Sequence, residues 1–482
     1  MTGLAGILLA LAALIYLAYR GISVLVLAPL TALIAVLASG APLLASYTQV
    51  FMPALGGFVI LYFPLFLLGA IFGKLMEVTG AARVIGAGLA ARLGARHAIL
   101  AIVLACALLT YGGVSLFVVA FAVYPVAAAL FQQADLPRRL IPATVALGAF
   151  TFTMTALPGT PAIQNAIPMP FFNTTPFAAP GLGLLGGAVM LALGMLWLAR
   201  RERAARRAGE GYGDDPQAAV PARPDKDVRD VAQGEGFDVA EVEGGPPAGP
   251  SLGLAVAPIV LVVALNYLFA EIVIPRMDTG YLALAAYGET SIEAVRGVWA
   301  IIGALAISIG ALLAAGWKRI ARPRRALDDG AAASVLPVMN TASQVGFGAV
   351  IASLPAFAVI RDAVLGIAPG NPLISLAVAV NVLAGITGSA SGGMSIALQT
   401  LGAHYLEMGQ AAGIAPQVLH RVTAIATGGL DALPHNGAVI TLLAICKLTH
   451  RQAYFDILVV AVLAPIAALV VVVAAATLLG AF

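Results

Sequence analysis

Runs of about 20 apolar residues recur along almost the whole chain, and each is long enough to cross a bilayer as an α-helix. Only 10% of the 482 residues are charged, whereas soluble chains average about 25%. The pattern predicts an all-α polytopic membrane protein. Eight runs are clear candidate spans: 4–19, 22–39, 51–73, 176–199, 252–273, 298–315, 335–358 and 455–479.

Four further apolar stretches contain breaks. Stretches 140–170 and 421–446 are interrupted by Pro, Gly and polar residues, which predicts two broken helices. Stretches 98–131 and 372–401 carry a Gly/Ser cluster in the middle, which predicts two re-entrant hairpins. A break frees backbone N–H and C=O groups that lipid cannot satisfy, so these groups must face protein, water or a bound solute.

The breaks recur at one spacing. The frame Ala-Leu-Pro-x-x-x-Ala contains Pro158 in one half and Pro434 in the other, 276 residues later. The same offset places the Gly/Ser cluster that begins at Gly112 on the one that begins at Gly388. We therefore predict two repeats, 1–199 and 251–482, each with five spans, one hairpin and one broken helix. An odd number of spans inverts the second copy, which makes this an inverted-topology repeat.

Residues 200–250 begin with five arginines and then become polar, acidic and rich in Gly and Pro. This composition predicts a flexible linker. Basic clusters at this linker and in the other short loops place it on the cytoplasmic side. Segment 74–96 is interpreted as an amphipathic surface helix. The Arg- and Ala-rich composition favours a bacterial source, and the expected location is the inner membrane.

In inverted repeats, a substrate site lies where the broken elements of the two halves meet. The positive ends of half-helices favour a small organic anion there. Polar side chains at the breaks suit carboxylates and hydroxyls, and glycines at the tips allow close backbone approach; the alternative at each tip is a tight turn without a ligand. The candidate substrate-binding residues are Gly112, Gly113, Ser115, Gly159, Thr160, Asn165, Ser389, Ser391, Gly392, His435 and Asn436.

Asp431 and His435 are the titratable pair in the second break and are candidates for proton coupling. Asp431 follows Thr423 and Thr427 at helical spacing, which predicts one shared face. The alternatives are that Asp431 caps the helix restarting after Pro434, and that His435 only satisfies freed carbonyls. Cys106 and Cys446 lie in apolar runs without ligand-spaced partners, so no metal or other cofactor is expected. No nucleic-acid partner is expected either.

Four segments resemble the gluconate permease family. The most specific is Gly-Gly-Leu-Asp-Ala-Leu-Pro-His-Asn-Gly-Ala-Val at 428–439, and 111–117, 157–161 and 388–393 are also similar. The similarity extends over nearly the whole chain outside the linker. This resemblance implies a proton-coupled symporter for gluconate-like acids. It also implies kinship with the wider ion transporter superfamily. Members of that superfamily form homodimers whose hairpins and broken helices make up a mobile, elevator-like part.

Other functions stay open on the sequence alone. Sodium-coupled dicarboxylate relatives carry Ser-Asn-Thr at each break, whereas this chain has Gly-Thr-Pro at 159–161 and His-Asn-Gly at 435–437. The second interpretation is a citrate-like or dicarboxylate carrier, with sodium coupling as one option. An intramembrane enzyme using Asp431 and His435, or a passive channel, is a more distant one.

Overall fold

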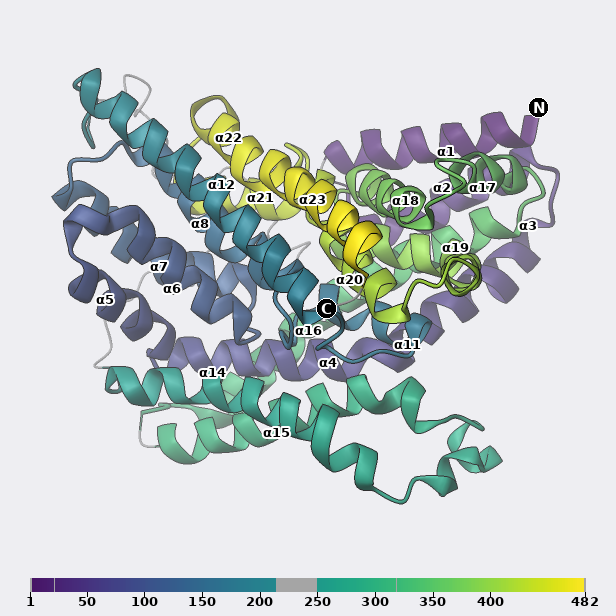
Figure 1. The fold of residues 1–482 in the computed structure, drawn as a ribbon, viewed down its shortest axis with the longest axis horizontal. Helices are drawn as coiled ribbons and strands as arrows, with labels where there is room; N and C mark the ends of the chain where they lie inside the picture. The colour runs from purple at the N-terminus through teal and green to yellow at the C-terminus, as the bar shows by residue number, and fades with distance from the viewer. Residues whose placement is uncertain (1, 21, 214–248, 318, 481–482) are drawn as a thin grey trace.

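The computed structural model describes residues 2–20, 22–213, 249–317 and 319–480, and the regular elements of these residues are all helices (Figure 1). Seven helical stretches of the described residues are long and apolar enough to cross a membrane, and an eighth qualifies if one bent pair counts as a single span. The prediction of an all-α polytopic membrane protein is confirmed.

Each of the eight predicted spans corresponds to a helix. The short α3 (Leu43–Ala45) and the π-helical turn η1 (Ser46–Phe51) extend α4, and a π-helical turn joins α22 to α23. The eight are α1 (Thr2–Tyr19), α2 (Val24–Ala38), α4 (Met52–Val78), α12 (Pro180–Arg207), α14 (Leu252–Tyr267), α15 (Ile292–Gly316), α16 (Pro323–Ser353) and α22 with α23 (His450–Leu458, Ala464–Leu479).

Both predicted hairpins are pairs of helices joined by a short turn. The first consists of α6 (Ala98–Tyr111) and α7 (Leu116–Gln133), and the second of α18 (Pro372–Thr387) and α19 (Ala390–Ala411). At about 1.5 Å per residue, α6 is about 21 Å long and α18 about 24 Å. Both incoming arms are therefore shorter than the roughly 30 Å hydrocarbon core of a bilayer.

Both predicted broken helices are also interrupted. In the first half, α8 (Ile141–Ala149) and α9 (Phe152–Thr155) precede the break, and α10 (Ile163–Ala166) and α11 (Pro168–Phe172) follow it. In the second half, α20 (Pro416–Thr427) and the 3₁₀ turn η9 (Leu430–Ala432) precede α21 (Gly437–Ile445). Proline lacks an N–H and clashes with the preceding turn, so the paired prolines of the first break end its helix.

The element order repeats between the halves. Adding 276 to the bounds of α6 and α8 gives 374–387 and 417–425, and α18 and α20 cover 372–387 and 416–427. Packing between the halves is reciprocal. Helix α2 of the first half lies against α16 of the second, and α15 of the second half lies against α4 of the first. Helices α4 and α16 pack along each other (Figure 1). This arrangement supports the predicted repeat; its inversion stays a prediction.

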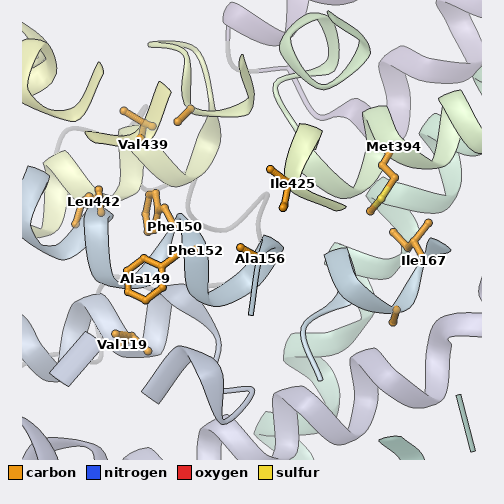
Figure 2. Packing of buried hydrophobic residues seen from close by; sticks show 14 of the residues in the cluster. Val119, Ala149, Phe150, Phe152, Ala156, Ile167, Met394, Ile425, Val439 and Leu442 are labelled. Carbon is orange, nitrogen blue, oxygen red and sulfur yellow. The ribbon is translucent and has the colours of Figure 1, made fainter. Parts of the chain in front are cut away.

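The hydrophobic core joins the two halves. One continuous cluster of buried apolar side chains includes Phe152 of α9, Ile425 of α20 and Val439 of α21 (Figure 2). Glycines allow the long helices to approach this cluster closely: a Cβ on Gly186 of α12 would lie 2.9 Å from Ile425 Cδ1. The broken helices of both halves are thus held in one packed body.

The predicted start of the linker is wrong. Helix α12 continues through residues 200–207 instead of ending at 199. The reason is ion pairing: Arg201 Nε donates to Asp456 Oδ1 of α22 over 2.7 Å, and Arg139 contacts both Asp456 and Glu210. Most of the predicted cytoplasmic linker, 214–248, lies outside the described residues.

The interpretation of 74–96 as one surface helix is also wrong. Residues up to Val78 belong to α4, and a left-handed Gly80 (φ +76°) separates them from α5 (Ala81–Leu93). Helix α5 buries Ile85 and packs against α6, α7 and α14, so one of its faces belongs to the protein interior.

Candidate functional site

The first hairpin tip touches the first break. The Tyr111 hydroxyl donates a 2.8 Å hydrogen bond to the carbonyl of Pro158. Gly113 has a left-handed backbone (φ +88°), and a Cβ there would lie 2.7 Å from Pro161 Cγ. Glycine is therefore required both by the turn and by the close approach.

The second tip touches the second break in the same manner. Asn436 Nδ2 donates to the carbonyl of Gly388 over 2.7 Å, and His435 Nε2 lies 3.2 Å from the carbonyl of Gly385. Gly388 is also left-handed (φ +62°). Each tip therefore contacts the break of its own half.

A cavity of about 680 Å³ lies at the first tip and break. This volume falls within the range of small-molecule pockets. Its wall is built by residues 113–118 of the tip and the start of α7, residues 161–164 of the break and start of α10, and parts of α4 and α16. Elements of both halves therefore enclose it.

Two buried side chains of this cavity lack hydrogen-bond partners among the described residues. They are Thr110, whose Oγ1 belongs to a side chain only 3% exposed, and Gln164, whose Oε1 belongs to one 8% exposed. An unmet buried polar atom costs about 1–3 kcal/mol. Both oxygens are themselves covered in this structure, so a polar ligand in the cavity would reach them only after a rotation of these side chains.

The first turn of α7 also lines the cavity. Helix N-termini carry partial positive charge and N–H groups that the helix itself does not use. Ser115 is the N-cap residue, but its exposed hydroxyl makes no capping hydrogen bond. This end of an 18-residue helix can therefore accept a carboxylate.

Charged side chains at the cavity balance one another. Lys74 and Arg83 are positively charged, and Glu77 and Asp329 are negatively charged. Lys74 Nζ is 3.5 Å from Glu77 Oε2. These four side chains add no formal net charge.

The equivalent helix ends in the second half are capped by their own side chains. Ser389 Oγ accepts from the N–H of Gly392 over 3.2 Å, and Asn436 Oδ1 accepts from the N–H of Val439 over 3.1 Å. Ser391 Oγ lies 3.3 Å from Thr341 Oγ1 of α16. These side chains are engaged within the protein.

The predicted site residues separate into two groups. Gly113 and Ser115 line the cavity, whereas the other nine do not. Gly112 packs on Ile259, and Gly392 packs on Gln344. The remaining first-half residues, Gly159, Thr160 and Asn165, support the break: Gly159 donates to the carbonyl of Pro176, and Thr160 Oγ1 accepts from the N–H of Ala162.

Asp431 lies outside the helix that was expected to carry it. Helix α20 ends at Thr427, because Gly428 and Gly429 follow, so the predicted face shared with Thr423 and Thr427 is wrong. The capping alternative is also wrong, since Asn436 caps α21. Asp431 Oδ1 is buried and has no hydrogen-bond partner among the described residues.

Sequence reasoning missed a buried polar network around Arg421. Arg421 Nη1 donates to Asn165 Oδ1 over 3.1 Å, and His420 Nε2 lies 3.2 Å from the same oxygen. The apolar pattern places Arg421 at the edge of a span, whereas α20 begins five residues earlier at Pro416. A charged residue within an apolar helix was the available signal.

The chain is 46% identical over 458 residues to the uncharacterized transporter YxjC of Bacillus subtilis strain 168. The match covers 94% of each protein. No protein-family model matches the chain. Identity of this extent shows common descent over nearly the whole length, including both hairpins and both breaks.

Proposed function

Since the chain belongs to the same transporter family as this Bacillus subtilis protein, we propose that it imports gluconate or a similar small hydroxy-monocarboxylate by proton symport. The resemblance of 428–439 and the three further segments to gluconate permeases supports this substrate class. The observation that carries the proposal is the cavity at the first tip and break, with its uncapped helix end and two unpartnered buried polar atoms.

The substrate carboxylate would bind at the first turn of α7, where the helix dipole and the Ser115 hydroxyl favour it. Substrate hydroxyls would bond Thr110 and Gln164. A hydroxyl can donate to the Gln164 carbonyl oxygen and accept from the Thr110 hydroxyl, so a polyhydroxy acid satisfies both.

Asp431 would carry the coupling proton. One oxygen of its carboxylate, Oδ1, is buried without a hydrogen-bond partner among the described residues, and burial makes the ionised form more costly than the protonated one. Movement through the membrane would thus favour the protonated form. His435 would hold the second tip through the Gly385 carbonyl instead of carrying the proton.

An elevator-like movement would carry the hairpins and broken helices together. Hydrogen bonds join each tip to its own break, so these elements can move as one body. A homodimer would supply the fixed part of such a carrier. Crosslinking of cysteine pairs between α19 of the second hairpin and α16, which pack against each other, in the two transport states would test this movement.

Uptake by proteoliposomes tests the substrate and the ion. A panel of sugar acids, citrate and C4-dicarboxylates would be offered with an imposed pH gradient, a sodium gradient or neither. We expect a hydroxy-monocarboxylate to accumulate under the pH gradient alone. Accumulation of citrate or a dicarboxylate under the sodium gradient would instead support the second interpretation from the sequence.

Gln164→Ala tests the cavity. Loss of one hydrogen bond of about 0.5–1.5 kcal/mol should weaken substrate binding roughly 3- to 10-fold. Gln49→Ala is the matched control, because Gln49 is exposed and distant from the cavity. Equal affinity of the two variants would place the substrate elsewhere.

Asp431→Asn tests the proton site. The variant should still exchange labelled for unlabelled substrate but should not accumulate it under a pH gradient. Asp362→Asn, on an exposed side chain, is the control. Undiminished accumulation by Asp431→Asn would assign the coupling proton to another group.

A further inference from the structure

Arg421 is a fully buried guanidinium in the middle of α20. Its Nε and Nη2 donate to the carbonyl of Ala178 over 3.0 and 2.8 Å. Nη2 also reaches the carbonyl of Pro176 over 3.3 Å, and Nη1 reaches Asn165 Oδ1 over 3.1 Å. Every acceptor is a neutral oxygen.

No carboxylate of the described residues pairs with this cation. Arginine remains charged in proteins, so its charge stays in the interior. Asp456 is also a deeply buried charged residue of the described chain, but it pairs with two cations, Arg139 and Arg201. A buried charge is costly unless an opposite charge compensates it, so Arg421 lacks what Asp456 has.

The Arg421 network forms the back of the cavity wall. Asn165 accepts from Arg421 and donates to the carbonyls of Thr160 and Pro176. Its chain neighbour Gln164 lines the cavity, as does Pro161, the neighbour of Thr160. The guanidinium is thus one layer of residues behind the first break.

The balanced charges at the cavity leave this cation without an internal partner there. Lys74, Arg83, Glu77 and Asp329 sum to zero formal charge. His420, the titratable neighbour of Arg421, lies 2.6 Å from Thr174 Oγ1 and also contacts Asn165.

We propose that Arg421 is the fixed counter-charge of the bound anion, acting through the wall formed by the first break. The guanidinium does not touch the substrate; it makes the loaded cavity neutral overall and selects a monoanion over a neutral analogue. This inference rests on the proposed function and specifies how that site chooses its substrate.

The expected effect follows from Coulomb's law. At a separation of about 8 Å and an effective dielectric constant of about 20, the attraction corresponds to roughly a thirtyfold change in a binding constant. A neutral amide of the same acid keeps its shape and hydroxyls but gains nothing from this charge. The start of α7 favours the acid equally in wild type and variant, so the change in the ratio of amide to acid dissociation constants when Arg421 is replaced reports the counter-charge.

The test measures both constants by calorimetry in detergent, with gluconate and gluconamide, or with the best acid of the uptake panel and its amide. Arg421→Gln removes the charge, and Asn165→Asp neutralises it in place with a carboxylate. Both should reduce the preference for the acid about thirtyfold. Arg421→Lys should retain it within about threefold, as should Arg206→Gln on a half-exposed side chain.

The outcomes separate the two proposals. If the wild-type protein binds none of the acids, the proposed function fails. Thermal unfolding shows which of Arg421→Gln and Asn165→Asp is folded. If the wild-type protein binds the acid and a folded variant keeps the wild-type preference for the acid, the counter-charge role is overturned. Equal weakening of acid and amide binding would also overturn it, because that pattern indicates structural damage to the break.

Discussion

The two tip–break pairs share one sequence frame and one contact pattern, yet they differ in how their helix ends are satisfied. In the second pair, Ser389 caps α19 and Asn436 caps α21. In the first pair, Ser115 before α7 makes no capping bond, and the N-cap residue of α10 is Ala162, which has no capping group. The cavity lies at the uncapped pair.

We infer from this difference that the second pair is a scaffold and the first pair is the proposed binding site. A capping side chain satisfies backbone N–H groups and occupies the place that an anion would take. An uncapped end inside the protein retains its binding capacity. The repeat thus supplies two similar frames, and the side chains at the helix starts decide which frame binds a solute.

Gly113→Ala should produce the largest effect on this comparison. The added Cβ would lie 2.7 Å from Pro161 Cγ, on a backbone with φ +88°. Left-handed strain and the clash together cost on the order of 3 kcal/mol, so we expect about a 100-fold loss of initial uptake rate in proteoliposomes.

Gly40→Ala is the control for strain alone. Gly40 has φ +68°, but a Cβ there meets no atom within 4 Å. Its uptake rate should stay within about twofold of wild type. If Gly113→Ala is equally harmless, the first tip does not need its close contact with the break.

Truncating the side chain at a helix start of each pair, in separate variants, should produce an intermediate effect. Asn436→Ala removes the cap of α21 and the bond to Gly388, which together contribute about 1–3 kcal/mol. We expect a melting temperature several degrees lower, measured by tryptophan fluorescence, with substrate affinity within about twofold of wild type. Ser115→Ala removes no bond within the protein, so its melting temperature should stay unchanged while affinity falls a few-fold.

The reverse pattern would refute the distinction. Reduced affinity without lower stability in Asn436→Ala would assign a substrate contact to the second pair. Reduced stability in Ser115→Ala would show that its hydroxyl supports the tip.

Much of the fold follows from local sequence. Spans, hairpins and breaks were predictable because apolar length, glycine and proline act within a few residues. The ends of charged helices were less predictable. Residues 200–207 resemble a linker in isolation, and only the pairing of Arg201 with Asp456 of α22 shows why the helix continues.

The candidate site was predictable only in part. Glycines and polar residues marked both tips, and Gly113 and Ser115 do line the cavity. The missing parts depend on tertiary contacts. Arg421 donates hydrogen bonds to the carbonyls of Pro176 and Ala178, more than 240 positions earlier in the chain. No local sequence pattern indicates that such distant segments meet.

The smallest expected effect concerns how the two broken helices are anchored. Arg421 anchors α20 within the membrane, and ion pairs of Arg139, in the 3₁₀ turn Arg138–Leu140 that precedes α8, anchor α8. Arg139 donates to both carboxylate oxygens of Glu210 over 2.6 Å, and this bonding lowers the pKa of Glu210 below its usual 4.5. A lowered pKa means that the pair contributes stability above about pH 4.5 and loses it as pH falls through the folded value.

Glu210→Gln should therefore abolish part of the acid sensitivity of the protein. Because both side chains are partly exposed, the pair contributes at most about 1 kcal/mol. The melting temperature is measured at about pH 5 and about pH 3.5, on either side of 4.5. Over this range the melting temperature of the wild type should fall more than that of the variant, and the extra decrease should be roughly 1–3 °C. The two proteins should show the same slope above pH 5. Identical slopes over the whole range would mean that the Arg139–Glu210 pair does not stabilise the start of α8, and that this broken helix is held by Asp456 alone.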